Sequence, residues 1–394
     1  MTLATFLMFV FWLSLLAVIT PYFIYPPLLF LLSRFRRPIG TGNGTPSVSL
    51  VISAYNEAAV IGEKLDNSCA LDYPAGQLET VVISDASDDG TDEIVQSFAD
   101  REVRLCRQAV RDGKSAALSR FVPSCRGEIV VFSDANSVYD AMAIRHLVGH
   151  FDDPRVGYVV GHQRYHDGEE AASKSENAYW DFEIKLKAWE SRLSSVVGGD
   201  GAIMAIRREL FTPLQKDDIN DFLIPLKSVV AGYRGRFEPE AFCFEEAAPS
   251  FAGEFKRKVR IVNRSFRAVT RAGGALNPIR VGIFAWQLFS HKVIRWCAPI
   301  FLVSCLVANF GLAWNGSSFF TLTLLLQAAF YLTALAKFFP IVGNWKLVYL
   351  CYYFCLSNVA AGFAIFNLML GRKFITWTPQ RAAANPETET KEVE

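Results

Sequence analysis

Hydrophobic residues are distributed unevenly along the chain, because both ends are far more apolar than the middle. Near the amino end Leu3 to Leu32 is almost wholly apolar, and near the other end Cys297 to Leu312, Phe319 to Phe339 and Leu347 to Leu370 have the same character. Helices of this length can cross the hydrocarbon core of a bilayer, although Cys297 to Leu312 is marginal. The pattern therefore predicts one soluble domain carried by membrane helices, rather than two soluble domains.

Basic residues after the first apolar segment predict its orientation in the membrane. Arg34, Arg36 and Arg37 follow it at once, and such residues favour the cytoplasmic side. We therefore expect a multi-pass protein of the inner or plasma membrane, with the amino terminus outside and the central domain in the cytoplasm. The side of the carboxyl tail is left open, because four spans place it outside whereas Arg372-Lys373 favours the inside.

Between the apolar ends, short β-branched runs alternate with helical patterns. Such alternation is typical of right-handed βαβ units, and it predicts an α/β fold built on a parallel sheet. The predicted strands are Val48–Ser53, Thr80–Ser84, Val103–Arg107, Ile129–Phe132, Val156–Val160 and Ala202–Ile206, and the later predicted helices are Tyr179–Leu193 and Leu223–Ala231.

Acidic residues lie at or just past the carboxyl ends of three of these strands, namely Glu57, Asp85 and Asp134. Ligands of such sheets bind beyond the carboxyl ends of the strands, so these acids predict a nucleotide or metal-diphosphate site. Asp134 and Asn136 lie two apart, and their oxygens can bind one divalent cation that holds a diphosphate. On these two residues alone, an Asx turn that closes the strand is an equally good interpretation.

No glycine-rich phosphate loop accompanies these acids, since neither Gly-x-x-x-x-Gly-Lys-[Ser/Thr] nor a Gly-x-Gly-x-x-Gly after the first strand occurs. We therefore expect a cation to hold the diphosphate. Lys114, after Gly113, could add a positive contact, or it could simply begin a helix. The glycines at 198, 199 and 201 could let the backbone approach a ligand, or they could form an ordinary turn.

Two charged segments further along allow a structural and a catalytic interpretation. The acidic run Asp217 to Asp221 opens a helix, where acids often serve as caps and complement the helix dipole. Asp221 is also the best-placed base for a sugar hydroxyl. The basic segment Lys256 to Arg267 could bind acidic lipid headgroups, or its Arg257 and Arg260 could neutralise a leaving diphosphate.

Composition narrows the class of partner. The chain has 394 residues, a net charge of +1 and no long basic run, which gives no reason to expect nucleic acid. Its eight cysteines are scattered without a Cys-x-x-Cys pair. We therefore expect neither a zinc site nor a disulfide scaffold, and a central domain that faces a reducing cytoplasm.

In this order the motifs resemble those of the family 2 inverting glycosyltransferases, over roughly Pro46 to Ile261. With the flanking spans, they resemble the membrane-embedded branch that includes cellulose, chitin, hyaluronan and poly-N-acetylglucosamine synthases. The resemblance implies a cytosolic α/β domain of the GT-A fold, which is a Rossmann-like mixed sheet with helices on both faces. The expected segments are a membrane helix at 1–33, a basic linker at 34–46, the catalytic domain at 47–270, an interfacial amphipathic region at 271–294, membrane helices at 295–370 and a polar tail at 371–394.

The resemblance also implies roles for individual residues. Asp221 would be the catalytic base, and Asp134 and Asn136 would bind Mg²⁺ or Mn²⁺. The residues implied in binding the nucleotide sugar are Ala54, Tyr55, Glu57, Asp85, Lys114, Asp134, Arg257 and Arg260, and those implied on the acceptor side are Gly199, Asp200, Gly201 and Asn220.

Several positions depart from the family pattern. Asn136 replaces the metal-ligating aspartate, so the cation would be held with less protein charge. Asn220 replaces a glutamate but leaves the base intact. Arg257 and Ile261 replace the Gln and Trp of the motif Gln-x-x-Arg-Trp, whose tryptophan helps to seat the acceptor sugar in processive synthases. Arg260 keeps the motif's arginine, but the feature tied to long-chain processivity is missing.

The expected reaction is inverting transfer from a UDP-sugar to a growing polysaccharide, with the spans assisting export. The alternative is single addition to a lipid-linked sugar at the inner leaflet, which the missing Gln and Trp favour. A catalytically decayed nucleotide-binding scaffold is a third interpretation, supported by Asn136 alone. Few ionisable residues occur in the predicted spans, which argues against a transporter. Membrane lipid is a further expected partner, and neither the sugar nor the oligomeric state can be read from the sequence.

Overall fold

The computed structural model describes residues 2–36, 40–165, 171–245, 251–343 and 345–376 of the 394-residue chain. Its centre is one eight-stranded sheet in the order β3-β2-β1-β4-β7-β6-β8-β5. Strands β1 to β4 are parallel, as their sequence pattern predicts, whereas β7 runs antiparallel to β4 and β6. The strands are β1 Val48–Ala54, β2 Leu78–Ser84, β3 Val103–Arg107, β4 Ile129–Asp134, β5 Val138–Tyr139, β6 Val156–Tyr165, β7 Met204–Arg207 and β8 Arg234–Glu245.

Helices cover both faces of this sheet because its central strands are apolar on both sides. Every residue of β1 is buried, and successive side chains point to opposite faces. Val51 packs on the face covered by α5, α8 and α9, and Leu50 on the face covered by α3, α4 and α6. These helices are α3 Ala58–Cys69, α4 Thr91–Gln96, α5 Lys114–Phe121, α6 Ala143–Val148, α8 Asn220–Val230 and α9 Phe251–Arg271, and α7 spans Ala171–Leu193.

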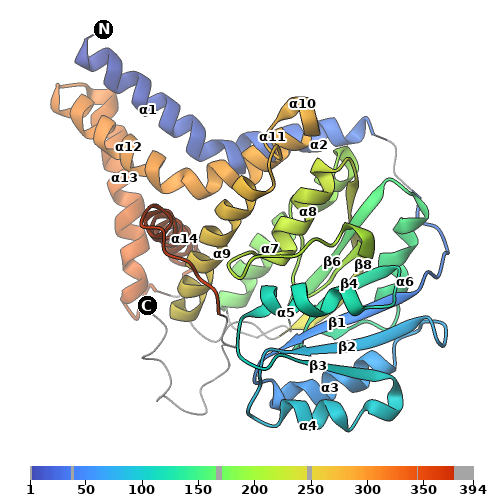
Figure 1. Cartoon of the computed structure of the whole chain (residues 1–394). Helices are drawn as coiled ribbons and strands as arrows, with labels where there is room; N and C mark the ends of the chain where they lie inside the picture. The colour runs from blue at the N-terminus through green and yellow to red at the C-terminus, as the bar shows by residue number, and fades with distance from the viewer. Residues whose placement is uncertain (1, 37–39, 166–170, 246–250, 344, 377–394) are drawn as a thin grey trace.

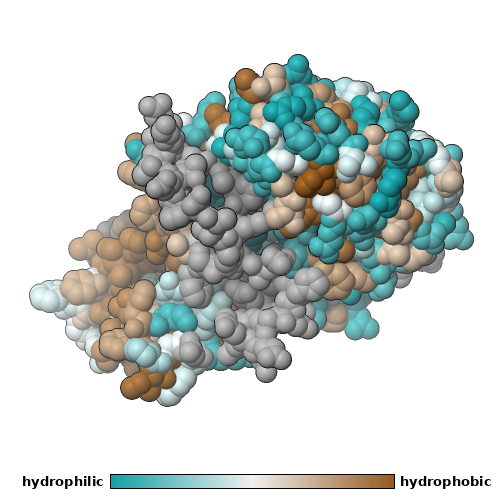
Figure 2. Space-filling view, turned by 90° about the horizontal axis from the view of Figure 1, so that it is seen from below, coloured by the Kyte–Doolittle hydropathy of each residue, from teal (hydrophilic) through white to brown (hydrophobic). Residues whose placement is uncertain are grey.

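Within the described residues, four helical runs are long and apolar enough to cross a membrane, namely Leu3–Arg34, Phe284–Trp314, Ser318–Phe338 and Lys346–Met369. They gather at one end of the molecule (Figure 1), where hydrophobic residues dominate the surface, while the end that contains the sheet is largely hydrophilic (Figure 2). The first run comprises α1 Leu3–Ile19, the π-helix η1 Thr20–Ile24 and α2 Tyr25–Arg34, and the second comprises α11 Phe284–Leu288, the π-helix η6 Phe289–Val293 and α12 Ile294–Trp314. The third run contains α13 Ser318–Leu335, and the fourth is α14 Lys346–Met369. The short helix α10 Pro278–Val281 precedes the second run.

One feature of these runs differs from the sequence expectation. Part of the region expected to be interfacial, 271–294, instead continues from Phe284 into α12 without a break. Within the first run, Pro21 lies in the π-turn η1 and Pro26 in the first turn of α2, where a missing N–H does little harm. The short 3₁₀ turns are η2 Ala99–Arg101, η3 Val122–Ser124, η4 Gly149–Asp152, η5 Arg208–Leu210 and η7 Ala336–Phe338. Arg37 and the tail from 377 lie outside the described residues.

A buried cluster of charged and polar side chains joins the membrane helices to α7. Glu190 accepts hydrogen bonds from the Tyr25 hydroxyl (2.5 Å) and the Val197 amide (3.0 Å), and it lies 2.7 Å from His291 Nδ1. Arg295 donates to Glu183 (2.7 Å). Burial alone would raise the pKa of Glu183, but Arg295 and His291 hold that pKa well below its usual value. The cluster therefore connects the first and second membrane runs to the loop that follows α7.

Replacing Glu190 by Leu should destabilise the protein by about 3–5 kcal/mol, because it leaves the buried partners of the carboxylate unpaired. The measurement is thermal unfolding of the detergent-purified chain. Exposed Glu209 offers the control, since Glu209→Leu should change stability by no more than about 0.5 kcal/mol. Equal melting temperatures for the two variants would contradict the prediction.

Candidate active site

The loops after β1, β2 and β4 meet at one edge of the sheet, because these strands are parallel and in register. Ala54 pairs with Ser84 across β1 and β2, and Ser53 pairs with Asp134 across β1 and β4. The acids that follow the strands therefore lie on the same edge, as the sequence predicts.

The first two of these loops are locked together by hydrogen bonds. Asn56, with a φ of 53°, exchanges hydrogen bonds with Asp88 through its side chain (2.8 and 3.1 Å). Asparagine tolerates this left-handed conformation better than most residues. The Glu57 amide donates to Thr91 Oγ1 (2.8 Å), and the Ala58 amide donates to Asp89 (3.0 Å). The Asp-Asp-Gly-Thr turn thus fixes the start of α3.

Asp85 is buried and shapes the neighbouring loop. Its carboxylate accepts hydrogen bonds from Gln108 Nε2 (2.6 Å), the Asp112 amide (2.8 Å) and the Gly113 amide (2.9 Å). These bonds hold the loop that leads into Lys114 at the start of α5. A small pocket lies here, and its lining residues are Ser53, Ala54, Tyr55, Ile83, Asp85, Lys114 and Ala117.

Three charged groups meet around Gly201. Lys114 Nζ lies 2.5 Å from Asp134 Oδ1. A Cβ placed on Gly201 would lie 3.1 Å from Asp221 Oδ2, 3.6 Å from Asp134 Oδ2 and 3.8 Å from Lys114 Nζ. The missing side chain therefore leaves a small space bordered by two carboxylates and an ammonium group.

Asp221, the predicted base, has the electrostatic environment of one. Burial raises the pKa of its carboxyl to about 6, and the charges of Asp200 and Asp134 add to this effect, while Lys114 opposes it. Its Oδ1 is buried and has no hydrogen-bond partner among the described residues. A carboxylate with a pKa near neutrality and a free oxygen is suited to accept a proton.

The predicted acceptor-side residues pack around Asp221. The Gly199 amide donates to the Asp221 carbonyl (2.5 Å), and a Cβ on Gly199 would lie only 2.6 Å from that oxygen. Asn220 is buried beside it at the start of α8, and Lys187 Nζ donates to Asp200 Oδ2 (3.4 Å). The absence of a side chain at Gly199 thus allows close packing against α8.

One arginine of α9 that lies beside this site is Arg264. It is buried, and its Nη2 donates to Ser115 Oγ (3.1 Å) and to the Asp218 carbonyl. Burial lowers the pKa of Arg264, against the opposing charge of Asp221. Arg257, by contrast, pairs with Glu254 on its own helix (2.9 Å). Arg264 follows Arg260 by four residues, so helical spacing was the signal that could have identified it.

The acids before α8 are paired rather than used as helix caps. Arg271 donates to both oxygens of Asp217 (3.0 Å each) and to Asp218. These ion pairs tie α9 to the loop that precedes Asp221. Nowhere in the described ranges do three or more His, Cys, Asp or Glu side chains form a group that could hold a metal ion.

Comparison with known proteins identifies the family of the domain that holds this site. Residues 49–214 match the family described as Glycosyl transferase family 2. The chain carries a family 2 glycosyltransferase domain. The resemblance identified from the sequence motifs is thereby confirmed.

Relatives of this glycosyltransferase domain have been characterised in bacteria. The β-monoglucosyldiacylglycerol synthase of Trichormus variabilis is 30% identical over 166 residues, which cover 40% of this chain and 34% of that protein. The poly-β-1,6-N-acetyl-D-glucosamine synthase of Staphylococcus epidermidis is 24% identical over 227 residues, 54% of this chain and 53% of that protein. The chain thus matches about a third to a half of the length of these relatives.

A solved structure shares the fold of nearly the whole chain. The mannosyltransferase PcManGT from Pyrobaculum calidifontis, determined with GDP-Man and Mn²⁺, aligns with a TM-score of 0.71 and 24% identity, over 93% of this chain and 100% of that one. The predicted GT-A fold, with its flanking helices, is therefore confirmed.

The segment after α14 returns to the glycosyltransferase domain. The Arg267 guanidinium donates to the Arg372 carbonyl (2.9 Å), and Lys373 Nζ lies 3.8 Å from Asp217. A Cβ on Gly113 would lie 2.8 Å from the Ile375 carbonyl oxygen. Residues 372–376 therefore lie against the glycosyltransferase domain, beside the loop that leads into Lys114.

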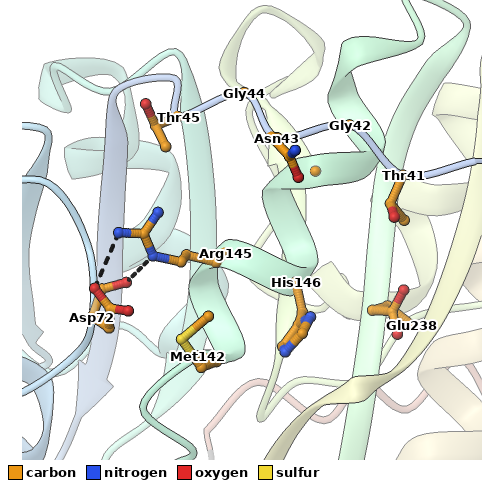
Figure 3. A pocket seen from close by; sticks show the side chains of 11 residues that line it. Thr41, Gly42, Asn43, Gly44, Thr45, Asp72, Met142, Arg145, His146 and Glu238 are labelled. Atoms are coloured by element: carbon orange, nitrogen blue, oxygen red, sulfur yellow. Dashed lines mark hydrogen bonds and ion pairs between the residues drawn. The ribbon is translucent and has the colours of Figure 1, made fainter.

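A larger pocket, of about 480 Å³, lies between the linker after α2 and helix α6 (Figure 3). Arg145 on its wall pairs with Asp72 (3.0 Å). The Gly44 amide donates to Asp152 (3.2 Å), and this bond holds the linker in place. None of the residues predicted for the active site lines this pocket.

Replacing Gly201 by Ala should lower the transfer rate by roughly 100-fold, because the added methyl group fills the space between Asp221 and Asp134 and displaces the reacting groups by about 1 Å. Turnover and melting temperature are measured together. Gly62→Ala is the matched control, since its Cβ would make only an ordinary 3.8 Å contact with Ile94. Full activity of Gly201→Ala would show that this space does not hold the reacting groups.

Proposed function

We propose that the chain is a membrane-bound inverting glycosyltransferase whose nucleotide-sugar donor binds across the carboxyl ends of β1, β2 and β4. One observation carries the proposal: Asp221 faces Asp134 and Lys114 across the bare Gly201. A base, a candidate metal ligand and a phosphate-binding cation thus border one space. In that space an acceptor hydroxyl and the anomeric carbon of a donor can be held in line.

The donor's nucleoside is proposed to bind over the mouth of the small pocket beside Tyr55. Ala54 and Asp85 line its walls, and buried Glu57 holds the adjoining turn through its backbone. The Asp85 carboxylate accepts hydrogen bonds from the loop at 108–113 and so sets the shape of the pocket. We propose that it also contacts the nucleoside. We propose a UDP-sugar as donor, with a GDP-sugar as the alternative that the ligand of PcManGT supports.

A divalent cation fits this site if the donor supplies part of its ligands. Asp134 directs Oδ2 toward the space at Gly201, and Asn136 follows it with an amide oxygen. Carboxylate and amide oxygens are the ligands that Mg²⁺ and Mn²⁺ accept. We propose that these two residues hold Mg²⁺ or Mn²⁺ together with the diphosphate. When bound, the cation would neutralise charge on the departing diphosphate.

In the proposed reaction, Asp221 takes the proton of the acceptor hydroxyl as its oxygen bonds to the anomeric carbon. The bond between that carbon and the diphosphate oxygen breaks at the same time, and the electron pair leaves with the nucleoside diphosphate. Lys114, which pairs with Asp134, and Arg264, which binds Ser115 next to it, are proposed to bind the leaving phosphates. Because the acceptor attacks opposite the leaving group, the anomeric configuration inverts.

The acceptor is proposed to be lipid-borne. Ile261 stands where processive synthases carry a tryptophan, so this position offers no aromatic ring to a growing chain. The relative from Trichormus variabilis is named for a glycolipid product. A growing polysaccharide is the second candidate, favoured by the likeness to a poly-N-acetylglucosamine synthase. The basic residues after the first membrane run favour a cytoplasmic catalytic domain.

Detergent-purified chain with Mn²⁺ should release nucleoside diphosphate from one member of a panel of UDP- and GDP-sugars, supplied with lipid extract. Asp221→Asn should reduce this release by about 10²–10⁴-fold, since it removes the base. Exposed Asp100→Asn is the control and should keep full activity. Product length then separates single addition from polymer. Donor binding without release, unaffected by Asp221→Asn, would support the decayed scaffold and contradict the proposal.

The pH dependence should report the ionisation of Asp221. A base acts when deprotonated, so kcat/KM should fall as the pH drops below about 6, the raised pKa of this carboxyl. Asp200→Asn removes a negative charge that raises this pKa, so its profile should shift toward lower pH. The measurement is the pH profile of both proteins with the same donor. A profile unmoved by Asp200→Asn would argue against Asp221 as the titrating group.

A further inference from the structure

The turn that follows Asp134 is held from beneath by two buried ionisable side chains. Ser137 lies next to Asn136 and is itself buried. Its carbonyl accepts a hydrogen bond from Lys64 Nζ (2.5 Å), and its hydroxyl donates to Glu245 Oε1. One residue of the turn is thus bound through its backbone by a lysine and through its side chain by a glutamate.

Lys64 belongs to a face of α3 that binds the residues after this turn. Its ammonium group lies 3.8 Å from the centre of the Tyr139 ring, and the side chain is only 1% exposed. Asn67, three residues further along the helix, exchanges two hydrogen bonds of 2.8 Å with the backbone of Tyr139. The segment 137–139 is therefore fixed to α3 at both ends.

Glu245 reaches the turn from the opposite direction. It is the last residue of β8, whose pairing with β5 places it opposite Ser137. Its second oxygen accepts a hydrogen bond from Gln163 Nε2 (2.5 Å), and the residue is only 9% exposed. Both carboxylate oxygens are thus used, so Glu245 acts on Ser137 from a fixed position.

Buried ionisable side chains are a poor means of stabilising a fold, because desolvation offsets most of the attraction that they gain. The presence of two of them next to the candidate cation site calls for another role. Asn136 has no charge to attract a cation, so its amide oxygen is useful only if it is correctly oriented. Groups that orient metal ligands typically change metal affinity by 10- to 100-fold when removed.

We infer that Lys64, Ser137 and Glu245 form a positioning clamp, which orients Asp134 and Asn136 toward the cation and the donor's diphosphate. This inference rests on the proposed function of the site. Lys64 and Glu245 are positioning residues, since each acts on the ligands through Ser137. None of the sequence motifs contains either of them.

The test measures Mn²⁺ binding to the detergent-purified full chain in the presence of UDP or of GDP. The EPR signal of Mn²⁺ reports the binding. Lys64→Met and Glu245→Gln should each weaken Mn²⁺ binding by about 10-fold or more. The double variant should bind Mn²⁺ more tightly than the summed affinity losses of the two single variants predict, because it leaves no uncompensated buried charge. Leu65→Ala, at a buried position on the same helix, should lower the melting temperature but leave Mn²⁺ affinity unchanged.

The outcomes separate the clamp from the proposed function. If the unaltered chain fails to bind Mn²⁺ both with UDP and with GDP, the proposal of a metal-dependent transferase is wrong, and the clamp is overturned with it. If the unaltered chain binds and both single variants bind equally well, the transferase stands and the clamp is overturned. The clamp is also overturned if Leu65→Ala weakens Mn²⁺ binding as much, for each degree of melting temperature lost, as Lys64→Met and Glu245→Gln do. The weaker binding would then follow from lower stability.

Discussion

Negative charge gathered at the carboxyl edge of the sheet, with little contact with water, is the constraint on which the site depends. Such carboxyls take up protons unless cations lie close by, and the pKa of Glu245 is raised to about 7 by burial and by the charge of Asp134. The basic side chains near these carboxyls come from four different helices, with Lys64 from α3, Lys114 from α5, Lys187 from α7 and Arg264 from α9. The active site is therefore complete only when all four helices are docked, which couples its chemistry to the packing of the whole domain.

The parts of the site that could be predicted from sequence are those set by local pattern. The strands β1 to β4 follow from short β-branched runs, and their parallel arrangement brings Asp85, Asp134 and Asn136 to one edge whatever the rest of the chain does. These inferences need only hydrophobic period, chain direction and residue type. Asp221 opens a helix after an acidic run, which alone favours helix capping, so its prediction as the base rests on the family resemblance.

The parts that could not be predicted depend on contacts between distant segments. Glu245 lies 108 residues from Ser137 in sequence, and Arg264 lies 149 residues from Ser115. The acids at Asp217 and Asp218 suggest helix capping in isolation, but Arg271 pairs with them only because α9 packs against α8. In each case the partner is determined by tertiary packing, which no local pattern reports.

The contact between Ile375 and Gly113 brings the chain, after its last apolar helix, back to the domain from which these helices depart. The chain leaves that domain before α12 and is beside it again after α14. A return to the same side of a bilayer needs an even number of crossings, so this contact is compatible with two spans among α12, α13 and α14 but not with three. Of the four candidate runs in the described chain, α14 is the most enclosed by protein, since 39% of its window is buried and it packs along α9.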